Sequence, residues 1–318
     1  MTTSTGVRQA GPGYRAPAPL GGRRARSVSG RRNTAAFWFL LPALVILTVF
    51  VVWPMVSALR LSFTDASGFG AVEWVGLDNY LRIFTEDDIR AAVWNTVLYA
   101  AMFTPTAVVV ALALALLVNH PRLPFRGLFR TALFLPFVIS LAVAAFAWSY
   151  LIDPQVGLLD YWLGRVGVQL GDPLQDPTLA MPAVAFVAVW KNFGFYLVIF
   201  LAGLQGVPGS LYEAAKVDGA GAWSRFRHVT LPMLSNTVAF VMIFALIAAL
   251  QAFDQIYVMT GGGPYGHTQT IVMEIYESGF RKLELGFASA LSYVLLIATL
   301  LLSLAQFAFF GRSENERN

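Results

Sequence analysis

The sequence predicts an all-α integral membrane protein whose core is a six-helix transmembrane bundle. Hydrophobic residues make up 57% of its 318 residues and charged residues only 13%, a balance too apolar for an ordinary soluble domain. Several runs also reach the roughly 20 apolar residues that a helix needs to cross a bilayer core. Buried helices of a soluble protein keep a polar stripe, whereas these runs are apolar on every side. This excludes the soluble alternative.

The expected spans follow from the uncharged runs. Residues 35–59, 91–119, 131–152, 233–253 and 285–311 carry no charge, and the run 181–206 carries only Lys191. We therefore expect helices at about 35–59, 91–119, 130–152, 180–206, 233–258 and 285–310. Four prolines lie within or at the ends of these spans and predict kinks, because neighbouring helices can satisfy the freed carbonyls: Pro42, Pro54, Pro105 and Pro136.

The segments outside the spans complete the domain organisation. Residues 1–34, rich in Gly, Pro, Ser and Arg, are expected to form a disordered basic tail. An Arg pair at 31–32 precedes the first apolar run, but that run exceeds the roughly 7–15 residues of a signal-peptide core. We therefore read residues 35–59 as an uncleaved span. A loop follows at 60–90, then a transmembrane core at 91–310 that includes a loop at 207–232, and a short tail at 311–318.

The positive charges predict how the chain is oriented in the membrane. Seven arginines and no acid precede the first span, and loop 120–130 has three arginines and no acid. Loop 60–90 has six acids against three arginines, and loop 153–178 has four acids against one arginine. The positive-inside rule then places both termini and loop 207–232 in the cytoplasm and loops 60–90 and 153–178 outside. The expected location is the cytoplasmic membrane. The basic tail is thus a topology signal, and no nucleic-acid partner is expected.

Catalytic and metal chemistry find no support in the composition. The chain has no cysteine, which excludes disulfides and thiolate metal sites. Its histidines, His120, His228 and His267, are scattered over loops expected on both sides of the membrane, and no H-E-x-x-H motif occurs. No G-x-x-x-x-G-K-[ST] phosphate loop is present either. We therefore expect no enzyme activity, no metal site and no cofactor bound by this chain.

Residues 211–232, LYEAAKVDGAGAWSRFRHVTLP, form a polar island between two apolar runs. Ser210 and Glu213 fit a capping box, followed by a helix at 211–218 that Gly219 stops. A second short helix is expected at about 222–228. One interpretation is a loop lying on anionic lipid. The segment has few large apolar residues and contains two acids, which favours a surface for another protein.

The island resembles the EAA loop of binding-protein-dependent ABC permeases. The matching residues are Glu213-Ala214-Ala215, Asp218-Gly219-Ala220, Phe226 and Leu231-Pro232. Other segments resemble the sugar-importing branch, of the maltose-permease-F and glycerol-phosphate-permease-A type, over roughly residues 37–310: Trp74 to Tyr80, Asn95-Thr96, Ala202 to Gln205, and Thr260-Gly261-Gly262-Gly263-Pro264.

The resemblance implies a permease subunit of an ABC importer for a sugar or related small solute. The island would be a coupling helix seated in a separate ATP-binding subunit that uses ATP-Mg. Expected partners are a second six-helix permease in a heterodimer, two copies of the ATPase subunit, an extracytoplasmic solute-binding protein and membrane lipids. Residues 261–264 would face the solute-binding protein, although three glycines and a proline also make a plain turn.

The substrate path is expected around Lys191, the only charge deep within a span. A buried cation is costly in a bilayer, so Lys191 should face a cavity unless it snorkels to the interface. Neighbouring side chains suit sugar binding, and Lys191 and Asp254 could pair, although an aromatic residue on a span more often packs than binds. The candidate residues are Trp190, Lys191, Asn192 and Tyr196 from the fourth span with Gln251 and Asp254 from the fifth.

Two other classes of function fit the sequence less well. A self-sufficient secondary transporter or channel usually shows inverted repeats or several intramembrane acids, and this chain has no convincing internal repeat. A membrane enzyme would need a catalytic cluster that the sequence lacks. The permease interpretation therefore leads.

Overall fold

The computed structural model describes residues 28–68, 70–168 and 171–315. These residues form helices and connecting loops, and the only β contacts among them are two isolated bridges, Thr64 with Trp74 and Ser67 with Glu284. The chain divides into two compact units, residues 1–54 and 55–318. Each is described by itself below.

One helical run begins in the first unit, and its last helix extends past residue 54. Helix α1 (Val28–Leu47) begins before the expected position 35, so residues 28–34 are helical and do not belong to the expected tail. The rest of that tail, residues 1–27, lies outside the described residues. A π-turn η1 (Thr48–Val52) follows α1, and α2 (Trp53–Leu61) continues it. Pro54 explains the wide turn, because proline lacks an N–H and its ring clashes with the carbonyl four residues earlier. Residues 37–61 form a candidate span.

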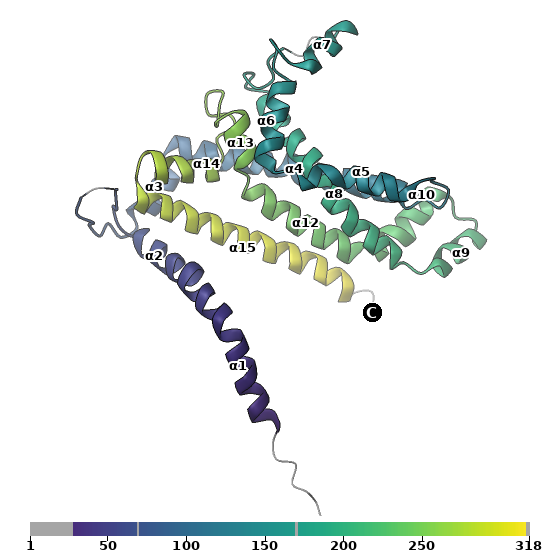
Figure 1. Cartoon of the computed structure of the whole chain (residues 1–318), viewed down its shortest axis with the longest axis horizontal. Coiled ribbons are helices and arrows are strands. Elements are labelled where there is room, and N and C mark those ends of the chain that lie inside the picture. The colour runs from purple at the N-terminus through teal and green to yellow at the C-terminus, as the bar shows by residue number, and fades with distance from the viewer. Residues whose placement is uncertain (1–27, 69, 169–170, 316–318) are drawn as a thin grey trace, which may run out of the picture. The chain divides into compact units, whose positions relative to one another are not determined.

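Two long helices form the centre of the second unit. Helix α4 (Asp87–Val118) has 32 residues and α8 (Ala180–Gln205) has 26, and they pack against each other (Figure 1). Ala107, Ala111 and Ala115 of α4 are completely buried. Their spacing of four places them on one face of the helix, and small side chains let helix backbones approach closely. Pro105 lies inside α4 without interrupting it.

The third expected span is broken, and the fifth is bent away from the segment that precedes it. Helices α5 (Arg126–Val138) and α6 (Leu141–Leu151) meet at 95°, with Ile139 extended between them. The segment Ala222–Met233 and α12 (Ser235–Leu250) meet at 70°. In the described residues four helices are long and apolar enough to cross a membrane, or six if each bent pair counts as one span.

The fifth helix is shorter than the expected range 233–258. Helix α12 ends at Leu250, and a separate helix α13 (Asp254–Met259) follows. Tertiary contacts fix this break. The Gln255 amide donates to the Tyr99 hydroxyl of α4 at 2.6 Å, and the Thr270 hydroxyl donates to the Ala252 carbonyl at 3.4 Å. Hydropathy alone could not predict the break, because both partners lie far away in sequence.

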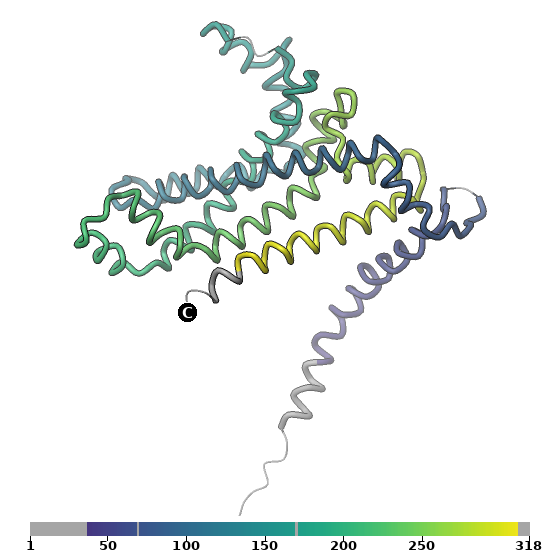
Figure 2. The backbone as a smooth tube through the Cα atoms, turned by 180° about the vertical axis from the view of Figure 1, so that it is seen from behind, coloured from purple at the N-terminus to yellow at the C-terminus, as the bar shows by residue number. Residues whose placement is uncertain are grey.

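The island and the acidic loops lie at opposite ends of the second unit. Helices α9 (Gly209–Val217) and α10 (Ala222–Arg225) lie at one end, called the island end. Helix α3 (Asp78–Thr85), α14 (Ile271–Tyr276) and the π-turn η3 (Glu277–Arg281) lie at the other, called the loop end. Helix α15 (Leu285–Asn315) runs between the two ends, and α7 (Leu158–Arg165) follows α6 (Figures 1 and 2).

A small core joins the elements of the loop end. Ile83 of α3, Ile89 of α4, Ile271 of α14 and Leu291 of α15 are buried together. The Asn79 amide donates to the carbonyls of Ser62 and Thr64 at 3.0 and 2.8 Å, which holds the chain after α2 against α3. The loop end is therefore an ordered structure and not a set of loose connections.

Candidate functional site

The island folds as a helix with a glycine stop. The Gly219 N–H donates to the Lys216 carbonyl at 3.1 Å, and the Ala220 N–H donates to the Ala215 carbonyl at 2.9 Å. This pair of bonds is the Schellman motif, which needs a left-handed residue after the helix. Gly219 supplies it with φ of 77°. The glycine stop predicted at this position is confirmed.

The capping box predicted at the start of this helix is wrong. Helix α9 begins at Gly209 after Pro208, and no side chain caps it. Ser210 and Glu213 therefore both lie within the helix, two positions too late for a capping box. The proline ring presets the backbone for the helix entry, so the chain turns without help from a side chain. Glu213 is left exposed on the island.

The second half of the island differs from the expected helix at 222–228. It consists of α10, the π-turn η2 (Phe226–Thr230) and a short helix α11 (Leu231–Met233). Pro232 follows the π-turn at the same distance as Pro54 follows η1, for the same physical reason. The Tyr212 hydroxyl contacts the Thr230 hydroxyl at 3.0 Å, which joins the two halves of the island.

The island faces solvent on one side and a cavity on the other. The exposed residues include Ala214, Asp218 and Gly219, while Ala215, Ala220, Phe226 and Pro232 are half-buried and Leu231 is 38% exposed. The cavity, of about 1100 Å³, lies between the island and the segment after α4. Its wall carries one acid and several cations: Glu213 with Arg122, Lys216 and Arg225.

Two exposed apolar side chains of the island were missed by the sequence analysis. Val217 is 87% exposed and Trp223 is 71% exposed. The Trp223 ring lies 5.3 Å from the Phe226 ring. A tryptophan in a polar loop was the available signal, because large exposed apolar residues often mark a contact with another protein.

The expected substrate-path residues are only partly brought together. Lys191 is half-buried, and its ammonium lies 4.5 Å from the centre of the Phe137 ring of α5. The Asn192 amide donates to the Ala188 carbonyl of its own helix at 2.8 Å. Tyr196 is only 3% exposed and packs in the core. These two side chains are thus already engaged by the protein.

The remaining candidates are Trp190, which precedes Lys191 in α8, and Gln251 and Asp254 near the start of α13. Trp190 lines an apolar cavity of about 450 Å³ between α4 and α8, and its ring meets Trp148 at 5.4 Å. Gln251 and Asp254 are exposed. No ion pair joins Lys191 to Asp254 among the described residues. The ammonium is stabilised by the Phe137 ring face instead, a cation–π contact.

The glycine-rich turn is anchored from α4. The Asn95 amide donates to the carbonyls of Gly266 and Gln269 at 2.8 and 3.0 Å. Gly262 and Pro264 are buried within the turn, Gly263 is half-buried and Gly261 is exposed. Next to them Tyr265 is 94% exposed. The surface that this turn offers to a partner therefore comes from Gly261 and Tyr265 more than from the inner glycines.

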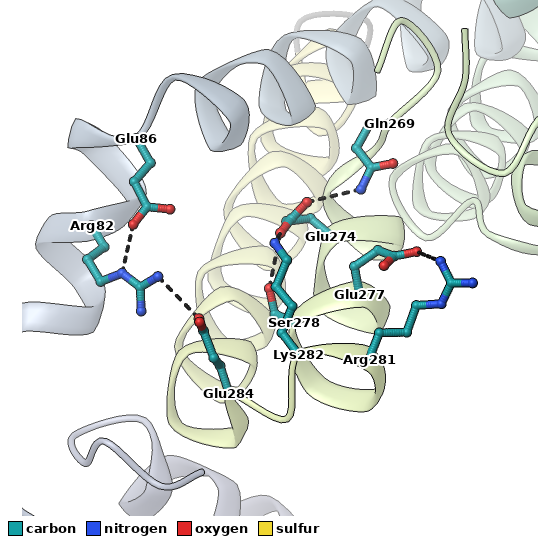
Figure 3. Close-up of polar contacts among 9 residues, drawn as sticks. All are labelled: Arg82, Glu86, Gln269, Glu274, Glu277, Ser278, Arg281, Lys282 and Glu284. Atoms are coloured by element: carbon teal, nitrogen blue, oxygen red, sulfur yellow. Dashed lines mark hydrogen bonds and ion pairs between the residues drawn. The ribbon is translucent and has the colours of Figure 1, made fainter. Parts of the chain in front are cut away.

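A network of charged residues braces the loop end (Figure 3). The buried Glu274 carboxylate accepts hydrogen bonds from Gln269 at 3.0 Å, Ser278 at 3.1 Å and Lys282 at 3.0 Å. Beside it, Arg82 donates to Glu86 at 2.8 Å and to Glu284 at 3.2 Å. The network ties α3 to the segment that enters α15.

Glu274 makes this network sensitive to acid. Burial would raise the pKa of Glu274, but the donors Gln269, Lys282 and Ser278 together hold that pKa below its usual value. A carboxyl with a lowered pKa stabilises the fold at pH values above its unfolded pKa. That stabilisation is lost as the pH falls through the lower, folded-state pKa.

We expect Glu274→Gln to lower the free energy of unfolding by about 1–3 kcal/mol at neutral pH, because Lys282 loses its buried acceptor. The difference in melting temperature from the wild type should shrink when the pH falls below about 4. Glu277→Gln is the matched control, since it removes a carboxylate whose partner Arg281 is 63% exposed. Such surface pairs contribute little. Equal melting temperatures for all three proteins at pH 7 would contradict the bracing role.

Comparisons with known proteins agree with this arrangement. Residues 86–314 match the model of the family described as binding-protein-dependent transport system inner membrane component. The sn-glycerol-3-phosphate transport system permease protein UgpA of Yersinia pestis bv. Antiqua is 35% identical over 280 residues, 87% of this chain and 94% of the relative. The diacetylchitobiose uptake system permease protein NgcF of Streptomyces coelicolor is 37% identical over 298 residues, 89% of this chain and 84% of the relative.

A solved structure shows the same fold. It is a bacterial alginate ABC transporter in complex with an alginate pentasaccharide-bound periplasmic protein. The TM-score is 0.77 with 23% sequence identity, and the match covers 89% of this chain and 96% of that chain. The fold of this chain is thus similar to that of the matched chain.

Proposed function

This chain belongs to the family of binding-protein-dependent transport system inner membrane components, and on that premise we propose that it is the permease subunit of an ABC importer that moves a sugar or related small solute into the cell. It is a multi-pass membrane protein and a transport component, not an enzyme. The observation that carries the proposal is the island, an exposed and internally braced helix-turn-helix at the end of the spans.

The island is proposed to receive the ATPase subunit. Its exposed small residues let another surface approach closely, and Val217 and Trp223 offer apolar contacts. The Schellman motif and the contact between Tyr212 and Thr230 make it stiff, so a movement of the ATPase would be transmitted to α8 and α12. ATP-Mg is bound by the partner in this scheme.

The other partners follow from the same premise. We infer a heterodimer with a second six-helix permease, two copies of the ATPase subunit, and a solute-binding protein that docks at the loop end near Gly261 and Tyr265. In this arrangement the island end and both termini face the cytoplasm, as the arginine distribution favours. The alginate transporter structure, which contains a periplasmic protein, supports the solute-binding protein among these partners.

The substrates in the names of the relatives support a sugar-like substrate for this chain. They are described as permeases for sn-glycerol 3-phosphate and diacetylchitobiose, both rich in hydroxyl groups. The half-buried Lys191 and the exposed Gln251 and Asp254 are proposed to line the path. These side chains can donate hydrogen bonds to, or accept them from, the hydroxyl groups of a substrate.

Reconstitution tests this function directly. The chain is co-expressed with the permease, ATPase and solute-binding protein proposed as its partners, and the complex is placed in proteoliposomes. We expect uptake of a labelled sugar that requires both ATP inside the vesicle and the binding protein outside. Uptake driven by an ion gradient without the ATPase subunit would instead support a secondary transporter or channel.

A further inference from the structure

Four aromatic rings form a continuous strip at the loop end. Phe253 precedes α13, Tyr257 lies in α13, Tyr276 ends α14 and Phe280 lies in η3. The rings of Phe253, Tyr257 and Tyr276 lie 5.2 Å from one another, and the Phe280 ring stacks on Tyr276 at 5.5 Å. We call these four residues the aromatic strip.

The strip is open to solvent and is bordered by charges. Phe280 is 74% exposed and Tyr257 is 41% exposed. Asp254 is exposed one helical turn from Tyr257. On the other side, Arg281 donates to Glu277 at 2.9 Å, and Figure 3 shows this pair apart from the group around Glu274.

The polar groups of the strip make it unsuitable for lipid chains. The Tyr276 hydroxyl meets the Tyr257 hydroxyl, and this hydrogen bond raises the pKa of Tyr276. Two acids and a guanidinium beside the rings would have to be desolvated in a hydrocarbon environment, which is costly. The bracing network does not use the four rings either, and Tyr257 and Phe280 keep the largest exposed surfaces among them.

We propose that the aromatic strip binds the pyranose rings of the substrate as it passes from the solute-binding protein toward the path at Lys191. A pyranose has an apolar C–H face and a rim of hydroxyls. The aromatic rings can pack on the C–H face of the pyranose. Asp254, Glu277 and Arg281 can form hydrogen bonds with its hydroxyls. The inference rests on the proposed function, since it needs a sugar substrate.

The length of the aromatic strip also indicates that it binds more than one sugar ring of the substrate. Phe253, Tyr257 and Tyr276 form one cluster, and Phe280 extends it to a second position. The exposed surfaces of Tyr257 and Phe280, each beside Tyr276, offer two adjoining positions, which suits a disaccharide or longer chain better than a single small solute. An alternative occupant is a protein partner, because tyrosine, phenylalanine and arginine are also enriched at protein interfaces. That alternative is an outcome of the test below.

The experiment uses the assembled importer in proteoliposomes with its solute-binding protein. The probes are a panel of labelled pyranose mono- and oligosaccharides, with labelled glycerol 3-phosphate as a probe that has no pyranose ring. The variants are Tyr257→Ala and Phe280→Ala. Phe280→Tyr keeps the ring, and Phe84→Ala is the matched control, because Phe84 of α3 is 71% exposed at the same end and lies outside the strip.

At a subsaturating sugar concentration, we expect Tyr257→Ala and Phe280→Ala to lower the rate of pyranose uptake by roughly fivefold to tenfold, because each loses an aromatic surface for the sugar ring. Phe280→Tyr and Phe84→Ala should keep uptake near the wild-type rate, and all variants should co-purify with their partners. If the wild type imports a pyranose and Phe280→Ala does so equally well, the strip is not a sugar site.

Two further results would overturn the inference in distinguishable ways. If Phe280→Ala loses the second permease or the solute-binding protein on purification, the strip is a protein interface. If the wild type imports glycerol 3-phosphate but no pyranose, the importer function stands and the strip has no pyranose to bind. Failure of the wild type to import any probe would instead contradict the proposed sugar function itself.

Discussion

Replacing Gly219 by valine is expected to lower ATP-driven uptake at least tenfold while the chain still inserts into the membrane. Gly219 adopts φ of 77° and closes the Schellman motif at the end of α9. A left-handed conformation costs an ordinary residue roughly 1–2 kcal/mol, and more for a β-branched one. The motif should therefore open, and Ala215 and Glu213 would lose their fixed position against the ATPase.

Two matched variants separate backbone strain from other effects. Nothing lies within 4 Å of a Cβ placed on Gly219, so bulk alone is tolerated there. Gly219→Asn should keep most of the uptake, because asparagine accepts the left-handed region. Gly219→Asp has nearly the same shape, so a further loss in Gly219→Asp measures the added negative charge. Uptake and ATPase activity are measured on the same vesicles. Normal uptake by Gly219→Val at native expression would contradict the proposed role of the island in coupling to the ATPase.

Replacing Gly194 by leucine is expected to destabilise the helix bundle strongly. A Cβ on Gly194 of α8 would lie 2.5 Å from the Leu133 carbonyl oxygen and 3.0 Å from the Phe134 Cα of α5. Backbone atoms cannot move aside as a side chain can. Overpacking of this kind costs about 1–3 kcal/mol and can cost more where the backbone has to shift. The two helices would separate where Lys191 packs on Phe137.

The melting temperature of the detergent-solubilised protein and the yield of folded protein measure this effect. Gly127→Leu is the control, because Gly127 lies in α5, the helix that Gly194 faces, with nothing within 4 Å of its Cβ position. Gly127→Leu should melt within a few degrees of the wild type. If the melting temperature of Gly194→Leu is also within a few degrees of the wild type, α5 and α8 are not in close contact at Gly194.

Local signals in the sequence were sufficient for the elements that depend on them. The long apolar runs predicted α4, α8 and α15 close to their observed positions, because burial of apolar surface acts on each segment separately. Gly219 predicted the end of α9 because only a few residue types adopt positive φ readily. The resemblance of the island to a known family rested on residues within the same short segment.

The tertiary structure decided the features that depend on distant partners. Helix α12 stops at Leu250 because Tyr99 engages Gln255 and Thr270 engages Ala252, and the glycine-rich turn is held by Asn95. The aromatic strip joins rings from α13, α14 and η3 that no spacing rule connects. The sequence by itself therefore determined which segments are apolar and where the island helix ends. Where the helices break and which side chains meet was decided by packing and hydrogen bonds between residues far apart in the chain.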